Sequence, residues 1–175
     1  MWIILGIVLI ILIWYISTYN KFKKLIIKVD EADSGIDVAL TKRYDLITKM
    51  VDVVKGYTKH EKETILEVIK LRKHMSINEK NEVLNKMNNS INKIEIIAEN
   101  YPDLKASENF KILQKSLLNV EEHLAASRRM YNSNVSIYNQ YLESFPSMII
   151  GSILKLTKKE YFEADDEKTV NISLK

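Results

Sequence analysis

The apolar positions of this chain fall into a small number of helical patterns, and the first one opens the chain. Residues 1–20, MWIILGIVLIILIWYISTYN, carry no charged side chain. At about 1.5 Å per residue, the segment from Met1 to Tyr19 spans about 28 Å, close to the hydrocarbon thickness of a bilayer. Aromatic residues stand at both ends, where an interfacial belt forms: Trp2, then Trp14, Tyr15 and Tyr19. We therefore expect residues 2–19 to cross the lipid bilayer once.

A cleaved signal peptide is the alternative interpretation of this segment. No basic residue precedes the apolar run and no small-x-small cleavage site follows it, which favours a retained anchor. Basic residues follow the span closely: Lys21, Lys23, Lys24 and Lys28. The positive-inside rule then predicts an N-terminus outside the cell membrane and a cytoplasmic remainder.

The second pattern predicts a long helix that runs on from the span. Its apolar positions are spaced four and three residues apart: Leu25, Val29, Ala32, Ile36, Leu40, Ile47, Met50, Val54 and Tyr57. This spacing is typical of a helix that packs on other helices. The skipped position is occupied by Arg43, and Gly56 is a suitable place for the chain to turn.

A third region, Thr58 to Asn100, is also helical in pattern. In its middle the segment SINE, Ser76 to Glu79, matches the capping box at a helix start. The break there is either a kink between two collinear helices or a real turn.

The stretch AENYPDLKASENF, residues 98–110, predicts a corner. Pro102 cannot continue the preceding helix, and Ser107 fits the N-cap of the next one. Leu104 is expected to plug the end of the bundle. The following helix carries a heptad-like stripe and ends near Pro146: Phe110, Leu113, Leu117, Val120, Leu124, Tyr131, Tyr138, Leu142 and Phe145. Residues 147–163 either fold back on the bundle or lie on a membrane surface, and we expect the former.

Composition supports helices and offers little chemistry. Among 175 residues there are four glycines, two prolines and no cysteine, so disulfides and thiolate sites are excluded. The three histidines, His60, His74 and His123, form neither HExxH nor Glu-x-x-His. There is no phosphate loop and no nucleophile elbow, and the formal charge of +3 is too small to suggest nucleic acid. We expect no enzyme, no metal and no cofactor.

Several segments together resemble the LemA family of bacterial membrane-anchored helical proteins. They are IDVALTKRYDLITKMVDVVKGYTKHE, AENYPDLKASENFKILQKSL, ASRRMYNSNVSIYN, ESFP and KKEYFEAD, in that order after an N-terminal anchor. Thr48 stands where the family often has proline, and Lys155-Leu156 replaces a common Gly-Phe pair. The resemblance implies an all-α bundle of long helices with up-and-down character. With the patterns above, we predict a four-helix-bundle-like fold: an anchor at residues 1–20 continuing into an up-and-down bundle of long antiparallel helices at 21–163, with a loosely ordered tail at 164–175. The resemblance implies no agreed biochemical activity.

The expected directions of the helices predict a polar layer in mid-bundle. If the first helix leaves the membrane, the second region returns and the helix from Ser107 leaves again, then Arg43 and Arg128 each lie about 30–35 Å from the membrane-proximal end. Arg43 lies on the apolar seam and needs a partner if it is buried. We predict that Arg43 lies near Arg128 or Arg129, balanced by carboxylates such as Asp45, Glu79, Glu82 or Glu121.

The same region is a candidate partner contact, with Tyr44, Tyr131 and Asn132 as further members. The alternative for the paired arginines is a solvated or register-fixing role. Asn132 and Asn139 lie seven residues apart on one helix face and are candidates to bond across helices.

These observations favour a single-pass, membrane-anchored scaffold or protein-interaction protein of the bacterial inner membrane. Its partner would be an unidentified membrane or cytoplasmic protein. The alternatives are a self-associating membrane organiser that uses the C-terminal apolar-basic segment as a second membrane contact, and an enzyme with a site that no sequence motif indicates.

Overall fold

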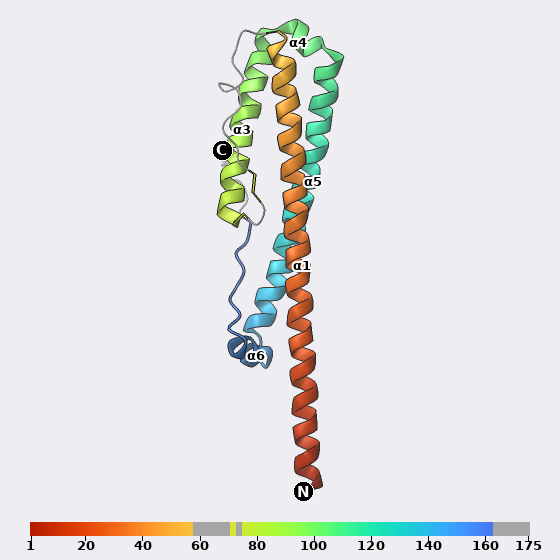
Figure 1. Ribbon diagram of the computed structural model, residues 1–175, viewed down its shortest axis with the longest axis vertical. Helices are drawn as coiled ribbons and strands as arrows, with labels where there is room; N and C mark the ends of the chain where they lie inside the picture. Colours follow the sequence, from red (N-terminus) through yellow and green to blue (C-terminus); the bar gives the residue numbers. More distant parts are fainter. Residues whose placement is uncertain (58–70, 73–74, 163–175) are drawn as a thin grey trace, which may run out of the picture.

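The protein is a bundle built around one very long helix, as a computed structural model describes it for residues 1–57, 71–72 and 75–162. Helix α1, Trp2–Lys55, has 54 residues, which corresponds to about 80 Å of unbroken helix. It ends at Gly56, the C-cap, as predicted. Figure 1 shows the N-terminal part of α1 projecting alone beyond the rest of the molecule.

The projecting part of α1 is long and apolar enough to cross a membrane, and among the described residues it is the one such segment. Its side chains are almost all exposed, including Trp2 at 86% and Ile10 at 67%. A core helix of a soluble protein would bury these side chains, so their exposure fits lipid as the surrounding solvent.

Helix α3, Ile77–Asn100, starts at the predicted capping box. The Ser76 hydroxyl accepts a hydrogen bond from the Glu79 N–H at 3.3 Å, and the Ser76 N–H donates to Glu79 Oε2 at 2.8 Å. The break predicted near Ser76 is therefore the start of a helix. The rest of the predicted helical region, residues 58–70 and 73–74, lies outside the described residues.

Helix α4, Pro102–Ala106, forms the corner, and α5, Glu108–Glu143, follows it. Leu104 is completely buried and closes this end of the core, as predicted. Ser107 is the N-cap of α5, but its hydroxyl makes no capping hydrogen bond.

The all-α bundle is confirmed, but the predicted directions of the helices were wrong. Lys80 on α3 contacts Asp33 on α1, and Asn88 contacts Arg43, so both helices advance together and are parallel. Glu121 on α5 also contacts Arg43, while Asn134 donates to the carbonyl oxygen of Lys28, so α5 is antiparallel to α1 and returns towards the anchor. The start of α3 explains the difference: its N-cap Ser76 lies four residues before Lys80, which contacts Asp33 and not the far end of α1, so α3 runs away from the anchor.

The predicted stripes account for most of the core. The buried members on α1 and α5 are Leu25, Val29, Ala32, Ile36, Leu40, Ile47, Met50, Val54, Phe110, Leu117, Val120, Leu124, Tyr131 and Tyr138. Two predicted members were wrong: Tyr57 is 42% exposed and Phe145 is 79% exposed. Both lie just beyond the end of a helix, where the periodicity no longer determines the direction of a side chain.

The chain folds back after α5, as expected. Helix α6, Ser147–Ile153, contacts both α1 and α5 near the anchor, and residues 155–162 then run along α5 away from the membrane end (Figure 1). Gly151 lies in a tight contact, because a Cβ there would be 2.5 Å from Leu142 Cδ1 and 3.5 Å from Phe22 Cζ. The tail from residue 163 lies outside the described residues.

Candidate functional site: the interior polar groups and the C-terminal clamp

Arg43 joins three helices. Arg43 is 4% exposed, and its Nη2 atom lies 2.5 Å from Glu121 Oε1 on α5 and 2.7 Å from Asn88 Oδ1 on α3. A charge taken out of water needs such partners, and Nη2 can serve both at once because it carries two N–H donors. Arg43 therefore sets the register of α1, α3 and α5 relative to one another.

A second buried cation lies about two turns nearer the anchor. The Lys80 side chain is completely buried, and its Nζ lies 2.6 Å from Asp33 Oδ1 and 2.7 Å from Asp37 Oδ1. The two aspartates lie four residues apart, on one face of α1, and each side chain keeps about one third of its surface exposed. One cation buried among apolar side chains is thus balanced by two carboxylates that reach water.

Four side chains of α5 hold the C-terminal segment. The amide group of Asn132 donates to the carbonyl oxygen of Phe162 and accepts from its N–H, at 2.9 and 2.8 Å. Asn139 repeats both bonds with Lys159, each at 2.9 Å. The hydroxyls of Tyr131 and Tyr138 donate to the carbonyl oxygens of Glu160 and Thr157, at 3.1 and 3.0 Å. We call these four residues the clamp.

The clamp binds backbone, so it recognises an extended chain rather than particular side chains. It consists of a Tyr-Asn pair repeated after seven residues, which places both pairs on one face of α5. Burial, followed by the charges of Asp33, Glu160 and Asp30, raises the pKa of Tyr131 to about 12. Burial also raises the pKa of Tyr138, so both hydroxyls keep the proton that they donate.

Comparison with known proteins identifies the relationship that the resemblance suggested. The family model described as "LemA family" matches residues 32–175, which is most of the chain. This chain belongs to the LemA family. A protein named LemA from Metamycoplasma hominis is 24% identical over 163 residues, which cover 90% of this chain and 74% of that protein.

Magnetosome proteins are similar to a shorter part of this LemA-family chain. MamQ of Magnetospirillum gryphiswaldense is 26% identical over 74 residues, and MamQ 1 of Paramagnetospirillum magneticum is 27% identical over 75 residues. These matches cover 42% and 43% of this chain but only 27% and 28% of the magnetosome proteins. The family match begins at residue 32 and does not include the apolar span.

The structure brings together only part of the predicted polar layer of the LemA-family bundle. Arg43 and Glu121 meet, whereas the Arg128 guanidinium lies over the Phe162 ring, 4.7 Å from its centroid. Arg129 is exposed. The predicted pairing of Arg43 with one of these arginines followed from the wrong direction of α5.

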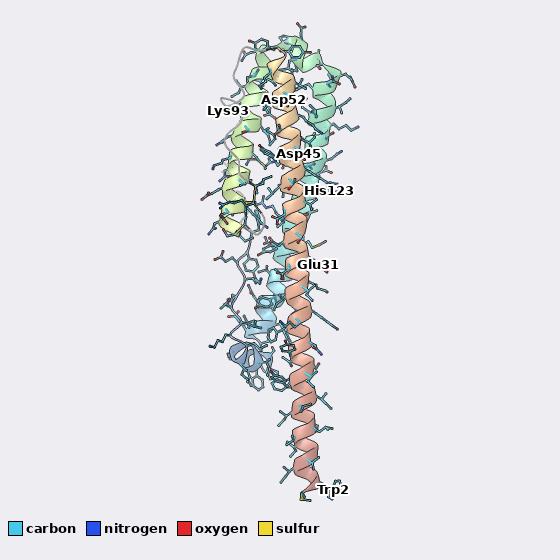
Figure 2. The ribbon with its side chains drawn as sticks, in the orientation of Figure 1. Trp2, Glu31, Asp45, Asp52, Lys93 and His123 are labelled. Carbon is cyan, nitrogen blue, oxygen red and sulfur yellow. The ribbon has the colours of Figure 1, made fainter. Side chains whose placement is uncertain are left out.

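The other predicted members are dispersed. Glu79 serves the capping box, where the backbone N–H and hydroxyl of Ser76, with Arg72 nearby, lower the pKa of the carboxyl. Asp45 and Glu82 are exposed, and Tyr44 is half-buried (Figure 2 labels Asp45). Among the described residues, no group of three or more His, Cys, Asp and Glu side chains could hold a metal ion.

Sequence reasoning missed Lys80 and misjudged the asparagines. Lys80 occupies a stripe position of α3, four residues before Leu84 and seven before Met87, which was a usable signal. Asn132 and Asn139 were expected to bond across helices, but they bind the extended C-terminal segment instead.

Proposed function

We propose that this LemA-family protein is a membrane-anchored scaffold that presents a partner protein at a fixed distance from the bacterial inner membrane. The continuous α1 supports the proposal, because no joint separates the membrane span from the bundle. The buried contacts of Arg43 and Lys80 support it as well, since they hold α3 and α5 in register along α1.

The observation that carries the proposal is an open groove between α1 and α5, lined by both apolar and polar residues, with exposed apolar side chains along it. Its volume is 340 Å³, and we call it the open seam; it is lined by Ser34, Gly35, Val38, Ala39, Lys42, Val120, His123 and Ser127 (Figure 2 labels His123). Val38 is 55% exposed, and Met130, one turn beyond Ser127, is 62% exposed. Apolar side chains gathered along a groove are typical of an interaction surface.

Photocrosslinking tests whether a protein binds the open seam. A photoreactive amino acid is placed at Val38 or Met130 in the full-length protein in its native membrane, with Glu95 on the outer side of α3 as the matched control. The proposal expects one recurrent protein from both seam positions and not from Glu95. It also expects Val38→Glu to abolish capture from Met130. Capture of the same set of proteins from all three positions would count against a specific seam.

The second candidate, a self-associating membrane organiser, is separated by the same experiment. It predicts crosslinks between two copies of this chain in place of a foreign protein. The proposed orientation, with the bundle in the cytoplasm, has its own test. Ser34→Cys, in a chain with no other cysteine, should resist a membrane-impermeant maleimide in intact cells and react after lysis.

A further inference from the structure

We infer that α6 and the corner before it form a second membrane contact, seated in the lipid headgroup region beside α1. The surface concerned is the α6 apolar face, which we define as Phe145, Met148, Ile149 and Ile153. The inference rests on the proposed insertion of residues 2–19 and adds where the bundle itself meets the bilayer.

The first observation is that α6 lies beside α1 just after the apolar span. Gly151 packs against Phe22, and the Phe22 ring lies 4.8 Å from that of Tyr141 near the end of α5. Phe22 follows the last residue of the apolar span, Tyr19, by about 5 Å of helix. Figure 1 shows α6 beside α1, where the solitary part of α1 begins. A bilayer that surrounds residues 2–19 therefore reaches the level of α6.

The second observation is that α6 has one buried face and one exposed apolar face. Ser147, Ile150 and Gly151 face the bundle and are buried. The α6 apolar face points away from it, with Phe145 79%, Met148 47%, Ile149 46% and Ile153 60% exposed. From Ser144 to Leu154 the chain carries no charged residue. Contiguous exposed apolar groups next to a membrane span are stabilised by entering the boundary between headgroups and acyl chains.

Charges around this face complete the argument. Lys21, Lys23 and Lys24 are exposed on α1 just after the span, and Lys155 is exposed just after α6, whereas Lys158 forms an ion pair with Glu143 at the end of α5. Lysines at this level attract anionic headgroups. A surface that is apolar at its centre and basic at its margin matches an anionic bilayer.

A second contact would change how the bundle stands on the membrane. The tilt and rotation of a single membrane-spanning helix are set by packing against neighbouring helices and by interfacial anchor residues. Contact through both α1 and α6 fixes the side of the bundle that faces the bilayer, and therefore the height and direction of the open seam.

Depth-dependent fluorescence quenching tests the inference with the full-length chain. Single cysteines carry an environment-sensitive dye at Ile149, at Ile10 in the span, or at Leu118, which is 65% exposed on α5. Each protein is placed in nanodiscs of phosphatidylcholine and phosphatidylglycerol that carry a nitroxide near the headgroup or deep in the acyl chains. We expect Ile149 to be quenched most by the shallow nitroxide, Ile10 by the deep one and Leu118 by neither. Unchanged helicity by circular dichroism, and a repeat at Phe145, guard against a misfolded variant.

The other outcomes each overturn a defined statement. If Ile10 is quenched but Ile149 behaves like Leu118, the anchor stands and the second contact is wrong. If the Ile149 dye shifts to the blue without quenching, a second copy of the chain covers the α6 apolar face and the lipid assignment is wrong. If Ile10 itself escapes quenching, the insertion of residues 2–19 fails, and with it the proposed anchored scaffold.

Discussion

Asn132 holds both backbone polar groups of Phe162, thirty residues further along the chain. Its amide donates to the carbonyl oxygen at 2.9 Å and accepts from the N–H at 2.8 Å. Asn139 does the same with Lys159, so an extended segment is fastened to α5 at two points without any strand to pair with. The side chains of α5 supply the hydrogen bonds that a neighbouring β-strand would supply in a sheet.

Asn132→Asp should loosen this attachment. A carboxylate still accepts from the Phe162 N–H, but it cannot donate to the carbonyl oxygen and places negative charge against it. We expect a loss of about 1–3 kcal/mol in the free energy of unfolding, and faster amide exchange at Lys159 and Phe162. Hydrogen exchange followed by mass spectrometry measures the second effect. The matched control is Asn119→Asp, at an exposed position of the same helix, and an equal effect there would refute the role of the clamp.

The raised pKa of Tyr131 predicts that the free energy of unfolding changes at alkaline pH. Its pKa is about 12 in the folded protein against about 10 in the unfolded chain, so between these values the folded state keeps a proton that the unfolded state has lost. The contribution is complete below about pH 10 and disappears as the pH rises towards 12. Titration of tyrosinate absorbance should show a step near pH 12 that Tyr131→Phe removes. Tyr161→Phe, which removes an exposed ring, must leave that step in place.

Lys80→Met should destabilise the bundle, and removing the charges of its two partners should offset part of the loss. The substitution leaves Asp33 and Asp37 without the cation between them, and we expect a loss of about 2–3 kcal/mol at neutral pH, because both carboxylates stay in partial contact with water. Asp33→Asn and Asp37→Asn together should reduce this loss. Chemical unfolding in detergent measures it. The exposed Lys86→Met is the control, and a loss that the two asparagine substitutions leave unchanged would contradict the account.

The buried charges also explain what the sequence could reveal about the fold. Apolar spacing identified the buried faces of α1 and α5, and SINE identified the start of α3, because these signals are local. The directions of α3 and α5 relative to α1 are revealed by pairs such as Arg43–Glu121 and Asp33–Lys80. The members of each pair are separated by dozens of residues along the chain. A stripe looks the same in a parallel and an antiparallel helix, so periodicity alone could not distinguish them. The sequence indicated only part of the clamp. Asn132 and Asn139 share a helix face, but their partner is an extended chain, which has no periodicity that would identify it.

Lys155→Gly should stabilise the protein. Lys155 has φ 51°, in the left-handed region, where it ends α6: its N–H donates to Ser152, and the Leu156 N–H donates to Gly151. Glycine is the residue that adopts this conformation without strain, and the LemA resemblance expected it there. We expect a gain of about 1 kcal/mol, seen as a higher melting temperature. Lys155→Ala removes the charge but keeps the Cβ, so an equal gain there would assign the effect to charge.

A disulfide between positions 35 and 127 should form and would test the direction of α5. A Cβ built on Gly35 lies 3.9 Å from the Cβ of Ser127. This separation falls within the range of about 3.5–4.5 Å that disulfides require. Mild oxidation of the Gly35→Cys/Ser127→Cys protein should therefore give a faster-migrating species on a non-reducing gel, and reductant should reverse it. The control pair, Gly35→Cys with Ser116→Cys, places the second thiol about 16 Å further along α5 and should not crosslink. Efficient bonding of the control pair, without bonding at position 127, would contradict this register of α1 and α5.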